Sequence, residues 1–256
     1  MTRSRSVQLT WPQLRLLQLI YEPFQQYGQW PAFQHVNALA WHVDADGAGL
    51  EFIAYETDDV TIERKNPFLS RAEMRRVMAR SLSLYQRRHA GRPPGRVLVH
   101  KTTEFKRAEV EGCFDALEIA EVVELVQVKQ DGHWRGVKIE GKRRPAAYPL
   151  DRGSYLQLGD REVLLWTQGN AAAAVGGNYY KEGKGVPLPL ELLRFAGHGG
   201  RESHLRATLG LTKMNWNNVS LYDRLPVTLE YAKVLADTVK RMPRLASRPY
   251  PFRLFM

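Results

Sequence analysis

The sequence predicts an α/β domain in which helices flank a mixed β-sheet. Between residues 70 and 128 the pattern alternates helix, strand, helix, strand, which indicates partly parallel strand pairing. Upstream, two strand-like runs enclose a Gly/Asp turn, as in a β-hairpin. With 256 residues, 44% of them hydrophobic, the chain can bury a core without a disulfide, and its single cysteine, Cys113, excludes an internal one.

The first 35 residues differ from the rest of the chain. After Trp11-Pro12, apolar residues recur through Ile20 and predict one helix that ends near Gly28. We therefore interpret residues 1–35 as an N-terminal helical segment and residues 36–256 as one domain. No apolar run is long enough to span a bilayer, and no apolar segment follows the basic start, so we expect a cytoplasmic protein.

The elements of the main domain follow in order. Residues 37–43 and 50–55 form the expected hairpin. Ser70 and Glu73 match a capping box, which opens a helix that ends near His89. The remaining expected elements are a strand over 96–100, a helix over 105–120, strands over 122–128, 136–139, 154–158 and 162–167, a Gly-rich basic loop over 176–185, the tail of a helix over 204–210, a strand over 211–216 and a closing helix over 226–242.

The charge balance favours an anionic partner. The chain has 37 Lys plus Arg against 27 Asp plus Glu, a net charge of +10. Such a surface attracts polyanions, because basic side chains release the counterions that nucleic acids hold. Many basic proteins bind nothing anionic, so the charge predicts a nucleic-acid partner only together with motifs.

Three segments carry such motifs. Residues 97–112, which include His100-Lys-Thr-Thr103, resemble the strand-to-helix segment of the PIWI domain in non-cutting prokaryotic Argonautes. Residues 211–233, with Leu-Thr-Lys-Met-Asn-Trp-Asn-Asn, Leu-Pro-Val-Thr and Tyr-Ala-Lys, resemble its end strand and final helix, and residues 252–256 resemble its apolar C-terminus. The resemblance implies an RNase H-like (PIWI) fold from a catalytically inactive Argonaute of the short or long-B type. Residues 1–35 would then be the remnant of a MID-like lobe.

The same resemblance locates the catalytic positions at Ala40, Thr102 and Lys233. Two-metal cleavage of a phosphodiester needs three or four carboxylate-type ligands, because Mg²⁺ and Mn²⁺ prefer oxygen. An alanine cannot bind a metal, a threonine binds it poorly, and a lysine brings a positive charge. We therefore expect no catalytic residues, no metal at this site and no enzymatic activity.

Asp44 and Asp46 support an alternative, a metal-dependent RNase H-like nuclease. Carboxylates two residues apart share one face of a strand and could hold a cation. Their Gly-flanked context favours a hairpin turn, where aspartate makes local hydrogen bonds.

Binding to a nucleic-acid backbone needs cations and amides that follow the phosphates. Lys213, Asn215 and Asn217 alternate, so on the expected strand they would share a face. Lys181 and Lys184 lie in the Gly-rich loop, whose amides could approach a phosphate, although a solvated loop is the alternative. The loop lacks the Lys-Ser/Thr ending of an ATP-binding P-loop.

Further candidates lie near the catalytic positions. Lys101, Thr102 and Lys106 follow the strand over 96–100, where they either bind the nucleic acid or form surface pairs. Lys233 and Lys240 are seven residues apart, two turns along one face of the closing helix.

The resemblance also implies partners. It directs the C-terminal carboxylate of Met256 to the 5′ end of a guide strand, which would require a bridging cation such as Mg²⁺ or help from Arg253 or Lys240. We expect guide and target nucleic acid, a protein partner (a MID-bearing subunit, an effector or a second copy) and a role in prokaryotic defence. A protein-interaction module with incidental charge is the second alternative.

Overall fold

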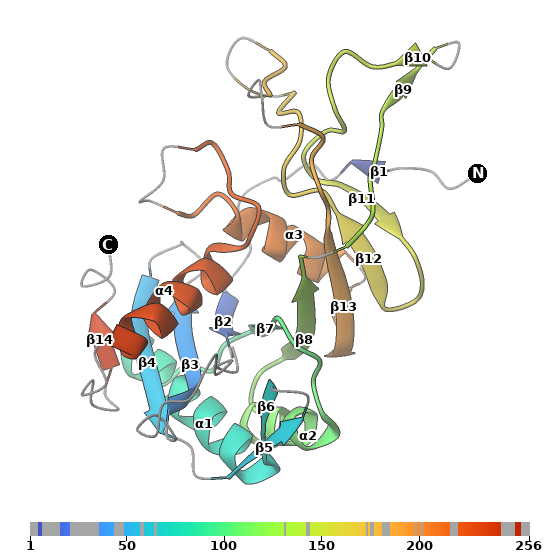
Figure 1. Cartoon of the computed structure of the whole chain (residues 1–256). Helices are drawn as coiled ribbons and strands as arrows, with labels where there is room; N and C mark the ends of the chain where they lie inside the picture. Colours follow the sequence, from blue (N-terminus) through green and yellow to red (C-terminus); the bar gives the residue numbers. More distant parts are fainter. Residues whose placement is uncertain are drawn as a thin grey trace. The chain divides into compact units, whose positions relative to one another are not determined.

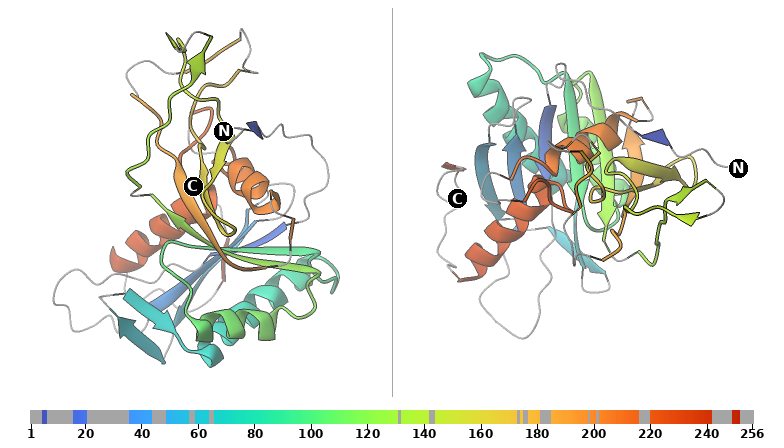
Figure 2. Two further views of the ribbon diagram at one scale, coloured as in Figure 1. Left: turned by 90° about the vertical axis from the view of Figure 1, so that its right-hand side faces the viewer. Right: turned by 90° about the horizontal axis from the view of Figure 1, so that it is seen from above.

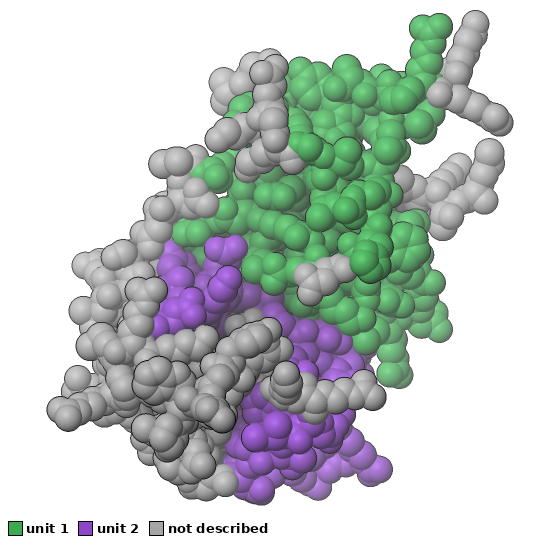
Figure 3. Space-filling model, viewed as in Figure 1, with its two compact units in different colours: residues 1–11, 128–193, 205–227 green, residues 12–127, 194–204, 228–256 purple. Residues whose placement is uncertain are grey.

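The structure is a computed structural model that forms two compact units. Unit 1 comprises residues 1–11, 128–193 and 205–227, and unit 2 comprises residues 12–127, 194–204 and 228–256 (Figure 3). Each unit is described by itself. The residues that the structure describes are 5–6, 16–20, 36–43, 49–56, 59–63, 66–130, 132–141, 144–172, 174, 177–180, 185–197, 199–200, 202–215, 220–241 and 249–251.

Unit 2 contains a parallel group of strands centred on β7 (Arg96–Lys101). Strands β2 (Leu16–Ile20) and β8 (Val122–Lys129) pair with β7 on its two sides, both in parallel (Figure 1). Val97, Leu98 and Val99 are all fully buried, so both faces of β7 are covered. A continuous apolar run of this kind is typical of a parallel strand between two layers of helices.

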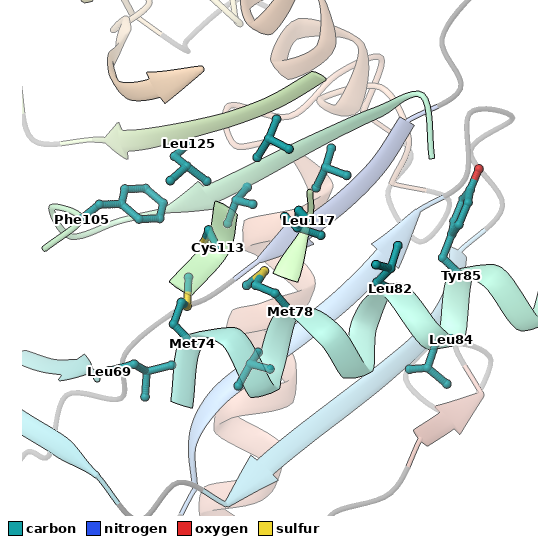
Figure 4. Packing of buried hydrophobic residues seen from close by; sticks show 14 residues of the cluster. Leu69, Met74, Met78, Leu82, Leu84, Tyr85, Phe105, Cys113, Leu117 and Leu125 are labelled. Carbon is teal, nitrogen blue, oxygen red and sulfur yellow. The ribbon is translucent and has the colours of Figure 1, made fainter. Parts of the chain in front are cut away.

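Helices α1 (Arg71–Arg88) and α2 (Arg107–Ala116) lie side by side on one face of β7 and β8 (Figure 2). Ser70 caps α1, since its hydroxyl accepts a hydrogen bond from the Glu73 backbone N–H at 3.3 Å. Figure 4 shows the resulting core, whose buried members include Met74, Met78, Cys113, Leu117, Val97, Val99, Val123 and Leu125.

The other face of these strands is covered by α4 (Val227–Arg241) (Figure 2). Nδ1 of His100, near the end of β7, lies 3.3 Å from the hydroxyl of Thr228 in the first turn of α4. Unit 2 also holds an antiparallel sheet in the order β14-β4-β3 and a two-stranded β5–β6 pair. Their bounds are β3 (Val36–Val43), β4 (Gly49–Glu56), β5 (Val60–Glu63), β6 (Asn66–Leu69) and β14 (Pro249–Pro251).

Unit 1 is built on antiparallel strands. Strands β11 (Ser154–Gln157) and β12 (Glu162–Leu165) pair with each other, β1 (Arg5–Ser6) joins β11, and β13 (Leu190–Gly197) joins β12 through residues 190–193. Leu190 and Leu192 alternate on the buried face of β13. A short pair, β9 (Ile139–Glu140) and β10 (Arg144–Pro145), lies in the same unit, and α3 (Ser203–Leu211) ends in it.

Most of the predicted elements are confirmed. The α/β class with a mixed sheet flanked by helices is correct, as are the two hairpin strands, the Ser70 cap, the β7–α2–β8 sequence and the closing helix. Among the described residues, no helix is long and apolar enough to cross a membrane.

The helix expected to end near Gly28 is wrong for its described part. Residues 16–20 form strand β2, which pairs with β7 from Leu16 opposite Arg96 to Ile20 opposite His100. A short apolar run fits a buried strand as well as a helix, and periodicity alone cannot separate the two. The interpretation of residues 1–35 as a MID-like remnant stays a prediction.

The strand expected over residues 211–216 is also wrong for its described part, residues 211–215. Helix α3 continues to Leu211, and turns follow in which the N–H groups of Thr212 and Lys213 donate to the carbonyls of Leu209 and Gly210. The sequence pattern did not predict strand β13, which pairs with β12 in the sheet. The strand expected over 136–139 is reduced to β9, which begins at Ile139.

Candidate functional site

At the end of β7, Lys101 is buried in the core. Its ammonium lies 2.7 and 2.6 Å from the two carboxylate oxygens of Glu109 in α2 and 3.0 Å from the carbonyl oxygen of Glu104. Both paired side chains are 0% exposed. The pKa of Lys101 is lowered by burial, which the charge of Glu109 opposes. The prediction that Lys101 binds nucleic acid is wrong, because its charged group faces the interior and is already neutralised.

The Lys101–Glu109 pair fixes the loop that follows β7. The Glu109 carboxylate also accepts hydrogen bonds from the backbone N–H groups of Leu69 (3.2 Å) and Lys106 (2.9 Å). A buried ion pair offsets its desolvation only when further hydrogen bonds satisfy it, as these do. The loop is therefore held in one position at the carboxyl end of the central strand.

Thr102 and Lys106 lie on this loop. Thr102 is half-buried, and its carbonyl accepts a hydrogen bond of 2.9 Å from the side-chain amide of Gln127 in β8. The ammonium of Lys106 lies 2.6 Å from Glu104 and 2.7 Å from Glu63, and hydrogen bonds to Glu104 and Glu63 raise its pKa. Lys106 is thus at the surface, with its charge shared between two carboxylates.

The three positions assigned to catalysis lie on separate elements of unit 2. Ala40 is in β3, Thr102 follows β7, and Lys233 is exposed on α4. Within the described part of the chain, no group of three or more His, Cys, Asp or Glu side chains could hold a metal ion. Asp44 and Asp46 lie outside the described residues.

In unit 1, Lys213 and Asn215 follow α3 rather than sharing the face of a strand. Lys213 is exposed, and its pKa is lowered by desolvation and then by the charge of Arg152. The side-chain amide of Asn215 donates to the carboxylate of Asp223 at 3.0 Å. Arg152 is a residue that the sequence reasoning missed, because nothing in the pattern around Arg152-Gly153 marks it as close to Lys213.

The other predicted binding residues cannot be placed. Lys240 is in α4, but its side chain lies outside the described residues. Outside the described residues altogether are Lys181, Lys184, Asn217, Arg253 and Met256, and with Met256 the expected Mg²⁺ site.

A second buried charge cluster surrounds Glu124 of β8 in unit 2. Its carboxylate is 0% exposed, pairs with Arg96 and Arg194, and accepts hydrogen bonds from the Ser203 hydroxyl at 3.1 and 3.2 Å. His204 lies 3.8 Å away, and burial lowers its pKa to about 4. The sequence pattern gave no sign of this cluster, which anchors the first residues of α3, Ser203 and His204.

Comparison with known proteins begins with sequence. No family model matches the chain. The protein argonaute of Thermus thermophilus is 28% identical over 157 residues, which are 61% of this chain and 20% of that protein. The chain is therefore Argonaute-like in sequence and spans a fifth of the length of this relative.

Solved structures of prokaryotic Argonautes share the fold. Clostridium butyricum Argonaute, bound to a guide DNA and a 19-mer target DNA, matches 94% of this chain with a TM-score of 0.62 and 16% identity. Marinitoga piezophila Argonaute, in complex with 5′ OH guide RNA and target DNA, matches 91% with a TM-score of 0.60 and 12% identity. Aquifex aeolicus Argonaute matches 92% with a TM-score of 0.56 and 17% identity. The matches cover 28%, 32% and 29% of those chains, respectively.

Proposed function

We propose that this chain is a PIWI-type module that holds a guide strand, or a guide–target duplex, by its backbone without cutting it. The observation that carries the proposal is the residue set at the carboxyl end of β7. There a buried Lys101 is followed by Thr102 and Thr103, where two-metal cleavage requires a carboxylate. Replacement of the carboxylates by Ala40 and Lys233 at the other two positions supports the same conclusion.

Backbone binding agrees with the charge and with the structural relatives. The net charge of +10 favours a polyanion, and two relatives of the same fold are described with guide and target strands bound. In such a complex the base sequence is read by pairing between the strands, while the protein recognises their shape and phosphates.

An inactive module needs a partner to produce an effect. We propose that it acts in prokaryotic defence in the cytoplasm, with a MID-bearing subunit, an effector or a second copy relaying recognition. The chain spans less than a third of each of these three solved Argonautes, so the activities of those whole proteins are not transferred to it.

A binding titration tests the proposal. Short single strands and guide–target duplexes are titrated by fluorescence anisotropy from about 50 to about 500 mM salt, and affinity is expected to fall steeply. A signal that does not change with salt would favour a protein-interaction module with incidental charge.

A cleavage assay tests the nuclease alternative. Guide-loaded protein is incubated with matched target and Mn²⁺, and no cleavage is expected. Cleavage that Asp44→Ala abolishes would contradict the proposal and identify the active carboxylates.

A further inference from the structure

Two cations of unit 1, Arg152 and Lys213, lie close together beside the end of α3. One terminal nitrogen of Arg152 donates to the Leu209 carbonyl at 2.7 Å and to the Thr212 hydroxyl at 2.6 Å. Lys213 is the next residue after Thr212, and repulsion from Arg152 contributes to the lowering of its pKa. Among the described residues, no carboxylate pairs with either side chain.

Arg152 is buried to an extent that is costly for an unpaired charge. Its Nε atom is buried and has no hydrogen-bond partner among the described residues. Burial lowers the pKa of Arg152 to about 10. Its guanidinium carbon lies 5.2 Å from the centre of the Tyr222 ring, whose hydroxyl already donates to the Gly169 carbonyl. The described surroundings therefore orient Arg152, and no counterion for its charge lies among the described residues.

The end of α3 supplies only part of the missing negative charge. A helix C-terminus carries roughly half an elementary negative charge, which favours one nearby cation. Here two cations share that end, and Lys213 extends into solvent. Capping of the helix accounts for the hydrogen bonds of one terminal nitrogen of Arg152. It gives no hydrogen-bond partner to the Nε–H of Arg152 and no role to the charge of Lys213.

We infer that Arg152 and Lys213 form an anion subsite that takes a phosphodiester group of a bound strand, with Arg152 as the largely buried binding residue and Lys213 as the exposed one. This inference rests on the proposed function. The planar guanidinium presents N–H donors in a geometry that suits two phosphate oxygens, and Lys213 adds a point charge from the solvent side. The anion offsets the repulsion between the two cations.

The test compares charge-matched variants. A 5′-hydroxyl thymidine decamer is titrated against the wild type, Arg152→Gln, Lys213→Gln and Arg161→Gln. Arg161 is the control, because it is an exposed arginine of the same unit in the turn between β11 and β12.

Arg152→Gln and Lys213→Gln are each expected to weaken binding about tenfold. Each is also expected to reduce the slope of log K against log salt by about 0.7, which corresponds to the loss of one phosphate contact on a single strand. Arg161→Gln is expected to stay within about twofold of the wild type. If Arg152→Gln fails to fold, Lys213→Gln carries the same comparison, because an exposed side chain can be changed without disturbing the core.

A second readout follows Arg152 directly. Its Nε–H resonance is expected to shift in ¹⁵N-correlation spectra when the decamer is added. A decamer that binds while the resonance stays fixed and both variants keep the wild-type salt slope overturns the subsite and leaves the proposed function intact. A wild type that binds neither the decamer nor a guide–target duplex overturns the proposed function instead. Inorganic phosphate then decides the subsite: a shifted Arg152 resonance supports it, and an unshifted one overturns it.

Discussion

Two buried histidines make the stability of unit 2 depend on pH. Burial lowers the pKa of His100 to about 3 and that of His204 to about 4, both from an ordinary 6.5. The folded state therefore keeps both rings neutral, while the unfolded chain takes up protons below about pH 6.5. Stability is complete above that pH and is lost as the pH falls from 6.5 towards 4.

The expected size of this effect is measurable. Between about pH 7 and about pH 5, each histidine reduces the free energy of unfolding by about 2 kcal/mol, since one pKa unit corresponds to about 1.4 kcal/mol. Urea titrations at the two pH values should show the combined loss from both histidines in the wild type. In His204→Gln, which keeps only His100, the loss should be about half of that combined value. The exposed His133 provides the control variant His133→Gln, which should lose as much as the wild type. Equal losses in both variants would contradict the burial argument.

Lys101 shows what residue-level sequence reasoning could not reach. Its position at the end of an apolar strand was predicted correctly, but its partner Glu109 lies on the next helix, and nothing local indicates that the two side chains meet in the core. A lysine is almost never fully buried unless it is paired, so the default reading is the surface. The sequence pattern did not indicate Arg152 as a site residue for the same reason, because its neighbours Leu209 and Thr212 are distant in sequence.

At the scale of elements, the α1–α2 packing depends on a missing side chain. A Cβ added at Gly112 would lie 2.5 Å from the Arg71 carbonyl oxygen and 2.9 Å from the Met74 Cβ atom. Gly112→Ala is therefore expected to lower the free energy of unfolding by about 1–3 kcal/mol, despite the higher helix propensity of alanine.

Gly210→Ala in α3 is the matched control. There the added Cβ meets nothing within 4 Å, so this variant should gain up to about 1 kcal/mol. Urea unfolding of both variants measures the difference, and a stabilised Gly112→Ala would show that the two helices pack less closely.

Elements were predictable where the local pattern and the tertiary environment agree. Ser70 caps α1 through its own side chain, and β7 and β8 are apolar runs whose short length fits a strand. Residues 16–20 read equally well as helix or strand, and only their pairing with β7 decides between the two. The segment 211–216 was misread because its polar and apolar residues alternate as in a strand, although α3 continues to Leu211 and turns follow at Thr212 and Lys213.

At the scale of the whole molecule, the order of helices and strands predicted the α/β class, whereas the site depends on which elements converge. The three proposed catalytic positions come from β3, the loop after β7 and α4, all within unit 2. If these positions face one site, as the resemblance implies, carboxylates placed at all three should create a cation site. We predict that the triple variant Ala40→Asp, Thr102→Asp, Lys233→Asp binds Mn²⁺, because hard cations need several converging oxygen ligands, whereas each single variant does not.

Electron paramagnetic resonance of Mn²⁺ measures this binding without requiring activity. The control is a triple variant with added aspartates on the solvent-exposed face of α1, Arg75→Asp, Arg80→Asp, Arg87→Asp, which should leave the Mn²⁺ signal of the free ion unchanged. Circular dichroism establishes that both triple variants are folded before they are compared. A folded catalytic-position variant that binds no more Mn²⁺ than this control would mean that Ala40, Thr102 and Lys233 do not converge. An active site would then have to be sought at other residues, with Asp44 and Asp46 the first to test.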